Sequence, residues 1–193
     1  MAEYREIRFS GSGGQGLILA GLILAEALVR EGKRVAQSTS YEPTSRGGLS
    51  RADLVVSTGE LDYPLVTALN LVVILDPVAV AAASGVLAPQ ALVVIDQQID
   101  VRPRGDCRIL ALPLAQTARS LGSLRVTNIT ALGALNEVSE TVATDTLETV
   151  IRERAPKKFL QLNLAAFSAG AALAAAAAQV APAAAMQGGA IAR

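Results

Sequence analysis

The stretch GSGGQG, residues 11–16, is the feature around which the predicted fold is built. It lies between a predicted strand at residues 7–10 and a long hydrophobic pattern, residues 17–30. Glycines at 11, 13 and 16 satisfy G-x-G-x-x-G, the spacing by which a strand turns tightly into a helix and a pyrophosphate reaches the bare backbone. A helix starting at about Gln15 would direct its unpaired N–H groups at a phosphate. The alternative is a glycine turn that is purely structural.

A nicotinamide dinucleotide matches this turn poorly. Such a unit needs an Asp or Glu about 20 residues beyond the glycines, at the end of the second strand, to bind a ribose hydroxyl. The second predicted strand, residues 34–39, instead ends in the polar residues QSTS at 37–40, and the nearest acid, Glu42, follows in a loop. An independent NAD(P)-binding Rossmann protein is therefore disfavoured, and a phosphate-bearing ligand of another kind is retained.

Composition excludes several classes of function. The chain has 193 residues, a formal net charge of zero and 3% aromatic residues, so it lacks the basic surface and stacking platforms that bind nucleic acid. It has one cysteine, Cys107, and no histidine, which excludes an internal disulfide and an iron–sulfur cluster held by its own cysteines. The charged start, residues 1–6, lacks the apolar region of a signal peptide, so we expect a cytoplasmic protein.

The apolar runs predict an α/β fold: a Rossmann-like, doubly wound, mainly parallel sheet with helices on both faces. Continuous apolar strands are covered on both faces, as in a parallel sheet. Strands are expected at residues 34–39, 52–57, 71–75, 91–96 and 108–112, and helices at residues 17–30, 77–83, 113–121, 144–153 and 159–180, with one more starting near residue 127. We expect one domain over residues 1–181, followed by a low-complexity tail at residues 182–193 and no membrane anchor.

A second candidate ligand-binding segment follows the second strand, at residues 40–51. Arg46, followed by two glycines, could clamp a phosphate or carboxylate, with Thr44 and Ser45 as hydroxyl donors. The alternative is a loop in which Arg46 and Arg51 pair with acids such as Glu42 and Asp53.

The remaining polar candidates have structural alternatives. Asp76 and Asp96 each end a strand and are expected to cap the next turn or helix rather than form a catalytic pair. Thr127 or Asn128 is placed to cap a helix. No catalytic residue and no metal ligand is predicted. The helix at residues 17–30 is apolar on nearly every side, so a sheet and a partner subunit are expected to cover it.

Five segments together resemble the gamma subunit of the 2-oxoacid:ferredoxin oxidoreductases, whose members act on 2-oxoglutarate, pyruvate, indolepyruvate or phenylglyoxylate. They are GSGGQG, the segment SYEPTSRGGLSR at residues 40–51, DYP at residues 62–64, TNITALG at residues 127–133 and PKKFLQLNLAAF at residues 156–167. The resemblance covers roughly residues 5–170.

The resemblance implies a subunit of a complex that makes acyl-CoA, CO₂ and a reduced acceptor. Thiamine diphosphate, Mg and [4Fe-4S] clusters would lie in alpha and beta subunits, with a ferredoxin-like delta subunit in some complexes, and ferredoxin or a similar acceptor would take the electrons. By analogy, coenzyme A would meet Gly13, Gly14, Gln15 and Gly16, the loop at Thr44, Ser45 and Arg46, and Asn128. The isolated chain is expected to be inactive, and a purely structural scaffold subunit is the alternative.

Overall fold

The structure is a computed structural model that describes residues 4–42 and 47–180. Its strands are β1 (Tyr4–Ser12), β2 (Arg34–Tyr41), β3 (Leu49–Ser57), β4 (Leu69–Ile74), β5 (Leu87–Asp96) and β6 (Cys107–Leu112). Its helices are α1 (Leu17–Arg30), α2 (Val78–Ser84), α3 (Leu114–Ser120), α4 (Thr127–Ser139), α5 (Thr144–Arg154) and α6 (Leu160–Val180), with short 3-10 turns η1 (Leu124–Val126) and η2 (Lys157–Phe159). Each predicted element is present, with ends shifted by a few residues.

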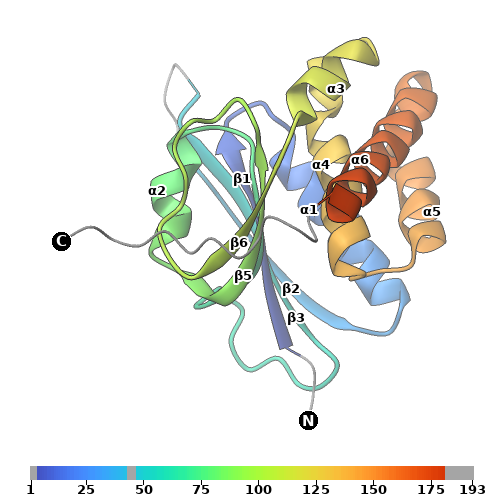
Figure 1. Ribbon diagram of the computed structural model, residues 1–193. Helices are drawn as coiled ribbons and strands as arrows, with labels where there is room; N and C mark the ends of the chain where they lie inside the picture. Colours follow the sequence, from blue (N-terminus) through green and yellow to red (C-terminus); the bar gives the residue numbers. More distant parts are fainter. Residues whose placement is uncertain (1–3, 43–46, 181–193) are drawn as a thin grey trace.

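The six strands form one mixed sheet in the order β2-β3-β1-β4-β5-β6 (Figure 1). β1, β4, β5 and β6 pair in parallel, and for β4 and β5 this agrees with the prediction from their continuous apolar runs. β3 pairs antiparallel with both β1 and β2, so β2 runs in the same direction as β1 without touching it. The predicted α/β class and mainly parallel sheet are confirmed, and the antiparallel β3 is the feature that the apolar pattern did not reveal.

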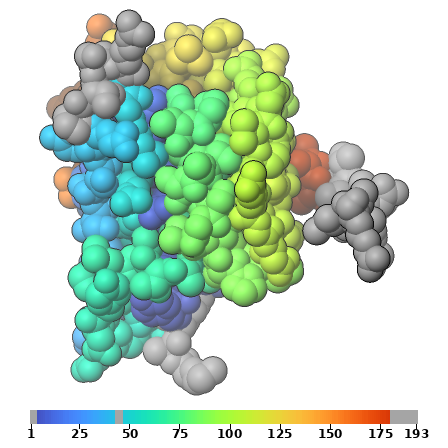
Figure 2. Space-filling view, turned by 90° about the vertical axis from the view of Figure 1, so that its left-hand side faces the viewer, coloured from blue at the N-terminus to red at the C-terminus, as the bar shows by residue number. Residues whose placement is uncertain are grey.

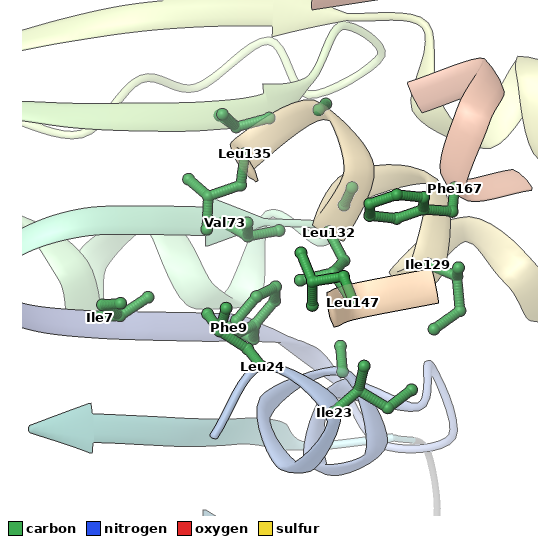
Figure 3. Close-up of a cluster of buried hydrophobic side chains, with 14 of the residues drawn as sticks. Ile7, Phe9, Ile23, Leu24, Val73, Ile129, Leu132, Leu135, Leu147 and Phe167 are labelled. Carbon is green, nitrogen blue, oxygen red and sulfur yellow. The ribbon is translucent and has the colours of Figure 1, made fainter. Parts of the chain in front are cut away.

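Helices cover the two faces of the sheet unequally. On one face, α1, α4, α5 and α6 pack in a thick layer over inward-facing residues of β1, β3 and β4, and Phe9, Leu24, Val73 and Leu132 lie in this cluster (Figures 1 and 3). On the other face, within the described residues, α2 lies over β1, β3 and β4, and its buried side chains cluster with those of β4 and β5 (Figure 1). Viewed from the α2 side, β2 reaches the surface in blue beside the green segments around α2 (Figure 2).

Two glycines bring α4 and α6 into backbone contact. A Cβ atom added at Gly170 would lie 1.8 Å from the carbonyl oxygen of Thr130, and one added at Gly133 would lie 2.1 Å from that of Phe167. α6 is also long and apolar enough to cross a membrane by length and composition alone, with 28% of its most apolar window buried inside the structure. The glycine contacts account for one side of that apolar surface, because they seat α6 on α4.

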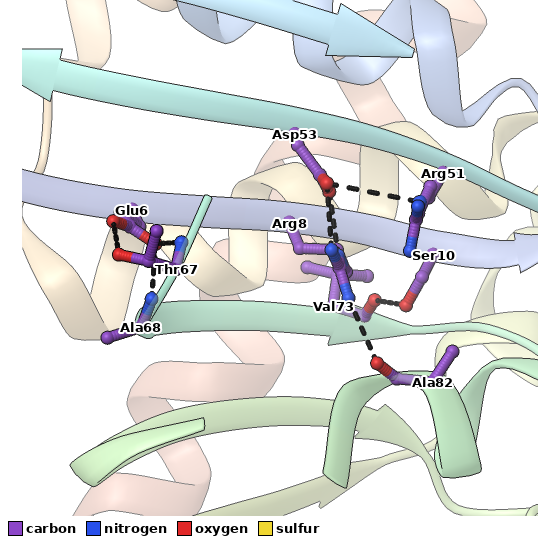
Figure 4. Close-up of polar contacts among 9 residues, drawn as sticks. All are labelled: Glu6, Arg8, Ser10, Arg51, Asp53, Thr67, Ala68, Val73 and Ala82. Atoms are coloured by element: carbon purple, nitrogen blue, oxygen red, sulfur yellow. Dashed lines mark hydrogen bonds and ion pairs between the residues drawn. The ribbon is translucent and has the colours of Figure 1, made fainter. Parts of the chain in front are cut away.

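A buried ion pair ties the thinly covered face together. Arg8 on β1 donates two hydrogen bonds to the carboxylate of Asp53 on β3, at 2.7 and 2.8 Å. Its third nitrogen donates to the carbonyl oxygen of Ala82 on α2 at 3.1 Å, so one side chain links two strands to the helix (Figure 4). Arg51, predicted as a partner of Asp53, lies 4.0 Å from the same carboxylate. The predicted pairing of Arg51 with Asp53 is confirmed, although Arg8 is the main partner of Asp53.

Candidate functional site

A cleft of about 600 Å³ opens at the carboxyl ends of β1, β4 and β5. In open α/β sheets ligands bind at this edge, where the crossover connections leave a central strand in opposite directions. Here the chain leaves β1 through α1 towards β2, while β4 lies on the other side of β1. The lining residues are Gly13, Gly14, Gln15, Leu75, Pro77, Asp96, Gln98, Ile99, Ala115, Arg119, Leu124, Arg125 and Thr127.

The glycine turn forms one wall of the cleft. Gly13 and Gly14 are exposed there, and Gly14 has φ +89°, a left-handed conformation that favours glycine. Gly16, also left-handed, precedes the first residue of α1 and provides no side-chain cap. Within the described ranges the N–H groups of Gly14 and Gly16 have no hydrogen-bond partner. The turn therefore presents backbone donors and the positive end of α1 beside open space, as predicted.

Gln15 lines the cleft but its side chain is used within the turn. Its Oε1 accepts a hydrogen bond from Ser12 N at 2.9 Å, and its Nε2 donates to the carbonyl oxygen of Leu75 at 3.1 Å. A Cβ atom at Gly11 would lie 2.1 Å from that Oε1, so the first glycine of the motif makes room for this amide. Gln15 thus joins the turn to the end of β4, and its side-chain groups are occupied by these bonds.

Asn128 lies behind the turn and is only 2% exposed. Its Nδ2 donates to the carbonyl oxygen of Gly16 at 2.8 Å, and its Oδ1 is buried without a hydrogen-bond partner. The predicted helix cap at Thr127 or Asn128 is wrong. α4 begins after Val126 without a side-chain cap, because η1 leads directly into it, and Asn128 is bound to the turn 112 positions away instead.

The second candidate segment is only partly described. Thr44, Ser45 and Arg46 lie outside the described residues. The two glycines that come after them adjoin the turn, because Gly13 N donates to the carbonyl oxygen of Gly48 at 3.0 Å and the Gly47 backbone lies nearby. Segments that are more than 30 positions apart in the chain therefore meet at this edge of the sheet.

The acids of the cleft edge serve as caps, as predicted. Asp76 accepts from Val78 N at 3.0 Å. The two carboxylate oxygens of Asp96 accept from Gln98 N at 2.9 Å and from Ala115 N at 2.6 Å. Among the described residues there is no group of three or more potential metal-ligating side chains from His, Cys, Asp or Glu. The carboxylates of Asp76 and Asp96 are therefore engaged in backbone caps at this edge.

Sequence inspection missed the two cations of the cleft, Arg119 and Arg125. Arg119 lies in the last turn of α3, and Arg125 lies in η1. They stand six positions apart in a stretch without a recognisable motif, and more than 100 positions from the glycine turn. No local signal distinguishes them from other surface arginines, and only the packing of α3 against α4 brings them to this cleft.

Comparison with known proteins agrees with this arrangement. Residues 6–173 match the family model described as pyruvate ferredoxin/flavodoxin oxidoreductase. The chain is 34% identical to the 2-oxoglutarate synthase subunit KorC of Methanocaldococcus jannaschii, over 86% of this chain and 91% of that protein.

Two solved structures share the fold. The gamma subunit of a keto/oxoacid ferredoxin oxidoreductase from Geobacter sulfurreducens is 36% identical with a TM-score of 0.82, covering 91% of this chain and 98% of that one. A 2-oxoglutarate:ferredoxin oxidoreductase from Magnetococcus marinus, solved with 2-oxoglutarate, coenzyme A and succinyl-CoA bound, is 27% identical with a TM-score of 0.80, covering 90% of this chain and 31% of that one.

Proposed function

Because the chain belongs to the pyruvate ferredoxin/flavodoxin oxidoreductase family and is a gamma-type subunit of a 2-oxoacid:ferredoxin oxidoreductase, we propose that its cleft binds coenzyme A within the assembled enzyme. The observation that carries the proposal is the glycine turn, which presents the unpaired N–H groups of Gly14 and Gly16 beside a cleft large enough for part of a nucleotide. Coenzyme A carries a pyrophosphate, which suits such donors. A coenzyme A complex of a related enzyme supports the same ligand class.

The topology supports coenzyme A over a nicotinamide dinucleotide. In dinucleotide-binding folds, the strand that ends in the ribose-binding acid lies beside β1 and parallel to it. Here the neighbour of β1 on that side is β3, which runs antiparallel and begins, rather than ends, at the cleft edge. An acid placed as in those folds is therefore absent from this position among the described residues.

The remaining chemistry belongs, in this proposal, to partner subunits. One cysteine and no histidine leave this chain without the ligands of a [4Fe-4S] cluster. Thiamine diphosphate with Mg, which supplies the chemistry of 2-oxoacid decarboxylation, and the clusters that carry electrons to ferredoxin are assigned to alpha, beta and delta-type subunits in the cytoplasm. This chain contributes backbone donors, shape and charge to the acyl-accepting step.

Two glycines of matched geometry test the coenzyme A proposal. Gly14 and Gly32 both have positive φ, +89° and +79°, and a Cβ atom at either position meets nothing within 4 Å. Valine at either position brings similar backbone strain, on the order of 1–3 kcal/mol, but only Gly14 borders the cleft. We expect Gly14→Val to raise the Michaelis constant for coenzyme A at least about tenfold in the assembled enzyme, and Gly32→Val to leave it unchanged.

The half-reactions separate binding from assembly. Reduction of the clusters by the 2-oxoacid without coenzyme A should proceed normally in the Gly14→Val enzyme, because that step does not use the acyl acceptor. If the Gly14→Val enzyme assembles with an unchanged coenzyme A constant, or if Gly14→Val prevents subunit assembly while Gly32→Val does not, the turn is a scaffold element and the proposal is wrong.

A further inference from the structure

We propose that Arg119 and Arg125 form a second anion subsite in the cleft, which recognises the terminal 3′-phosphate of coenzyme A while the glycine turn receives its pyrophosphate. This inference rests on the proposed function and adds two specificity-determining residues to it. Both arginines line the same cleft as Gly13 and Gly14 but come from α3 and η1, whereas the turn comes from the β1–α1 connection.

The two guanidinium groups are available for a ligand. Both side chains are exposed, and within residues 4–42 and 47–180 neither makes a side-chain hydrogen bond or an ion pair. Some other arginines are paired: Arg8 with Asp53, and Arg30 and Arg154 with acids of α1 and α5. Arg34 and Arg108 also make no side-chain hydrogen bond or ion pair within the described residues, but they lie outside the cleft. Two unpaired cations at one cleft make a local excess of positive charge in a chain whose formal net charge is zero.

The acid of the cleft does not neutralise them. Asp96 is 3% exposed, and both of its oxygens are held by the backbone N–H groups of Gln98 and Ala115. The carboxylate is therefore engaged as the cap at the start of α3. The charged residues that line the cleft are two arginines and one aspartate. The net charge of the lining is therefore positive, which favours an anion.

The connection between α3 and η1, residues 121–123, is held in one conformation by hydrogen bonds. Gly122, at φ +106°, ends α3 in the left-handed region, and Ser123 N donates to the carbonyl oxygen of Ala118 at 3.1 Å. Ser123 Oγ then accepts from Arg125 N at 3.2 Å and caps η1. Arg119 lies just before this connection between α3 and η1, and Arg125 lies just after it. The backbones of both arginines are therefore fixed relative to the cleft.

The chemistry of the two walls suits two different phosphates. Backbone N–H groups at the start of a helix suit a pyrophosphate, whose negative charge is shared between two linked phosphate groups. A terminal phosphate monoester carries up to two negative charges on three free oxygens and is matched by guanidinium groups, which form paired charge-assisted bonds. In coenzyme A these two groups are separated by one ribose, so a single cleft can accommodate both.

Dephospho-coenzyme A, which lacks the 3′-phosphate and keeps the pyrophosphate, tests the assignment. Dissociation constants are measured by calorimetric titration of the assembled enzyme without 2-oxoacid. For Arg119→Gln/Arg125→Gln we expect coenzyme A to bind about 10- to 100-fold more weakly and dephospho-coenzyme A to bind as in the natural enzyme. Arg34→Gln/Arg108→Gln removes the same charge from exposed positions outside the cleft and should change neither constant.

Each outcome decides one of the two proposals. If Gly14→Val weakens both ligands and the Arg119/Arg125 double variant weakens neither, the cleft binds coenzyme A and the arginine assignment is wrong. Equal weakening of both ligands by the double variant also overturns the assignment, because it points to the pyrophosphate or to general attraction. If neither Gly14→Val nor the double variant affects either ligand, the proposed function itself fails. Arg125→Lys, which keeps the charge, should fall between the natural enzyme and the double variant.

Discussion

Gln15 and Asn128 both bind the backbone of the glycine turn through their side-chain amides. Gln15 joins the turn to Leu75, and Asn128 joins Gly16 to the start of α4. Both side chains were predicted to lie at the coenzyme A site; the structure places both beside the turn, and their contact with coenzyme A stays a prediction. In the proposed complex they are positioning residues, because coenzyme A above the turn would meet the backbone that these amides fix.

The Arg8–Asp53 pair provides a prediction about stability. The side chains of Arg8 and Asp53 are only 3% and 7% exposed. Removing one partner leaves a buried charge without compensation, which typically costs about 3–5 kcal/mol. We therefore expect Asp53→Ala to lower the free energy of unfolding by about that amount, as measured by urea denaturation.

The double variant Arg8→Met/Asp53→Leu is the informative control for this pair. It removes both charges, so it should be less destabilising than Asp53→Ala alone. Arg51→Gln, which removes only the distant 4.0 Å contact at a half-buried position, should change stability by less than about 1 kcal/mol. Asp53→Ala with natural stability would contradict the structural role of the pair.

Cys107 provides a prediction about pH dependence. Burial of the sulfur, and to a smaller extent the neighbouring Asp106 carboxylate, raises the pKa of the Cys107 thiol. The thiolate is the reactive form, so alkylation by iodoacetamide should need a higher pH in the folded chain than in urea. Asp106→Asn should lower the midpoint of the pH profile slightly. Identical midpoints in the folded and unfolded chain would refute this.

At the scale of elements, the contact between α4 and α6 depends on glycine. The Cβ positions of Gly133 and Gly170 are occupied by backbone atoms of the opposite helix, and backbone atoms cannot move aside as a flexible side chain can. Side chains at these positions would force the helices apart. The layer that covers α1 and the central strands therefore depends on two residues with no side chain.

Gly170→Ala should thus destabilise the protein by about 1–3 kcal/mol or more, because it overpacks a close helix contact. Gly85→Ala is the matched control. Gly85 has ordinary helical dihedrals and open space around its Cβ position, so alanine there should be neutral or stabilise by up to about 1 kcal/mol. Thermal unfolding of the two variants measures the contrast, and equal melting temperatures would argue against the contact.

At the scale of the whole molecule, the exposed apolar surface of α1 bears on assembly. α5 packs against α1 and covers one flank that a partner was expected to cover. A stripe formed by Ile18, Leu22 and Val29 stays outside, with 42%, 38% and 56% of each residue exposed. Apolar stripes of this kind mark protein interfaces, so we propose that part of a partner subunit covers the stripe.

The full chain without partners should accordingly be inactive and should self-associate. We expect Ile18→Gln/Leu22→Gln to reduce self-association, as measured by light scattering during gel filtration. Val78→Gln, which changes an exposed apolar residue on the opposite face, should have little effect. A natural chain that stays monomeric at high concentration would contradict the role of the stripe, and oxidoreductase activity of the chain alone would contradict the subunit proposal.

Much of the fold can be read from local pattern. Continuous apolar runs place β4 and β5 in a buried parallel sheet, and the glycines at 11, 13 and 16 define the turn into α1. Asp76 caps the start of α2, and Asp96 caps the turn that follows β5. These features depend on burial and backbone conformation within a few residues, and the spacing of apolar residues and glycines predicts both. They were sufficient to predict the fold class and the glycine turn that forms one wall of the cleft, and to identify the resemblance to the family.

The tertiary structure alone decided which distant segments meet. The antiparallel placement of β3 between β1 and β2, the bond from Asn128 to Gly16, and the convergence of Arg119 and Arg125 on the glycine turn all join segments far apart in the chain. Residue spacing carries no signal for such pairings, because a strand's neighbour and a side chain's surroundings are set by the packing of the whole chain. The second cationic wall of the cleft is therefore visible only in the folded molecule.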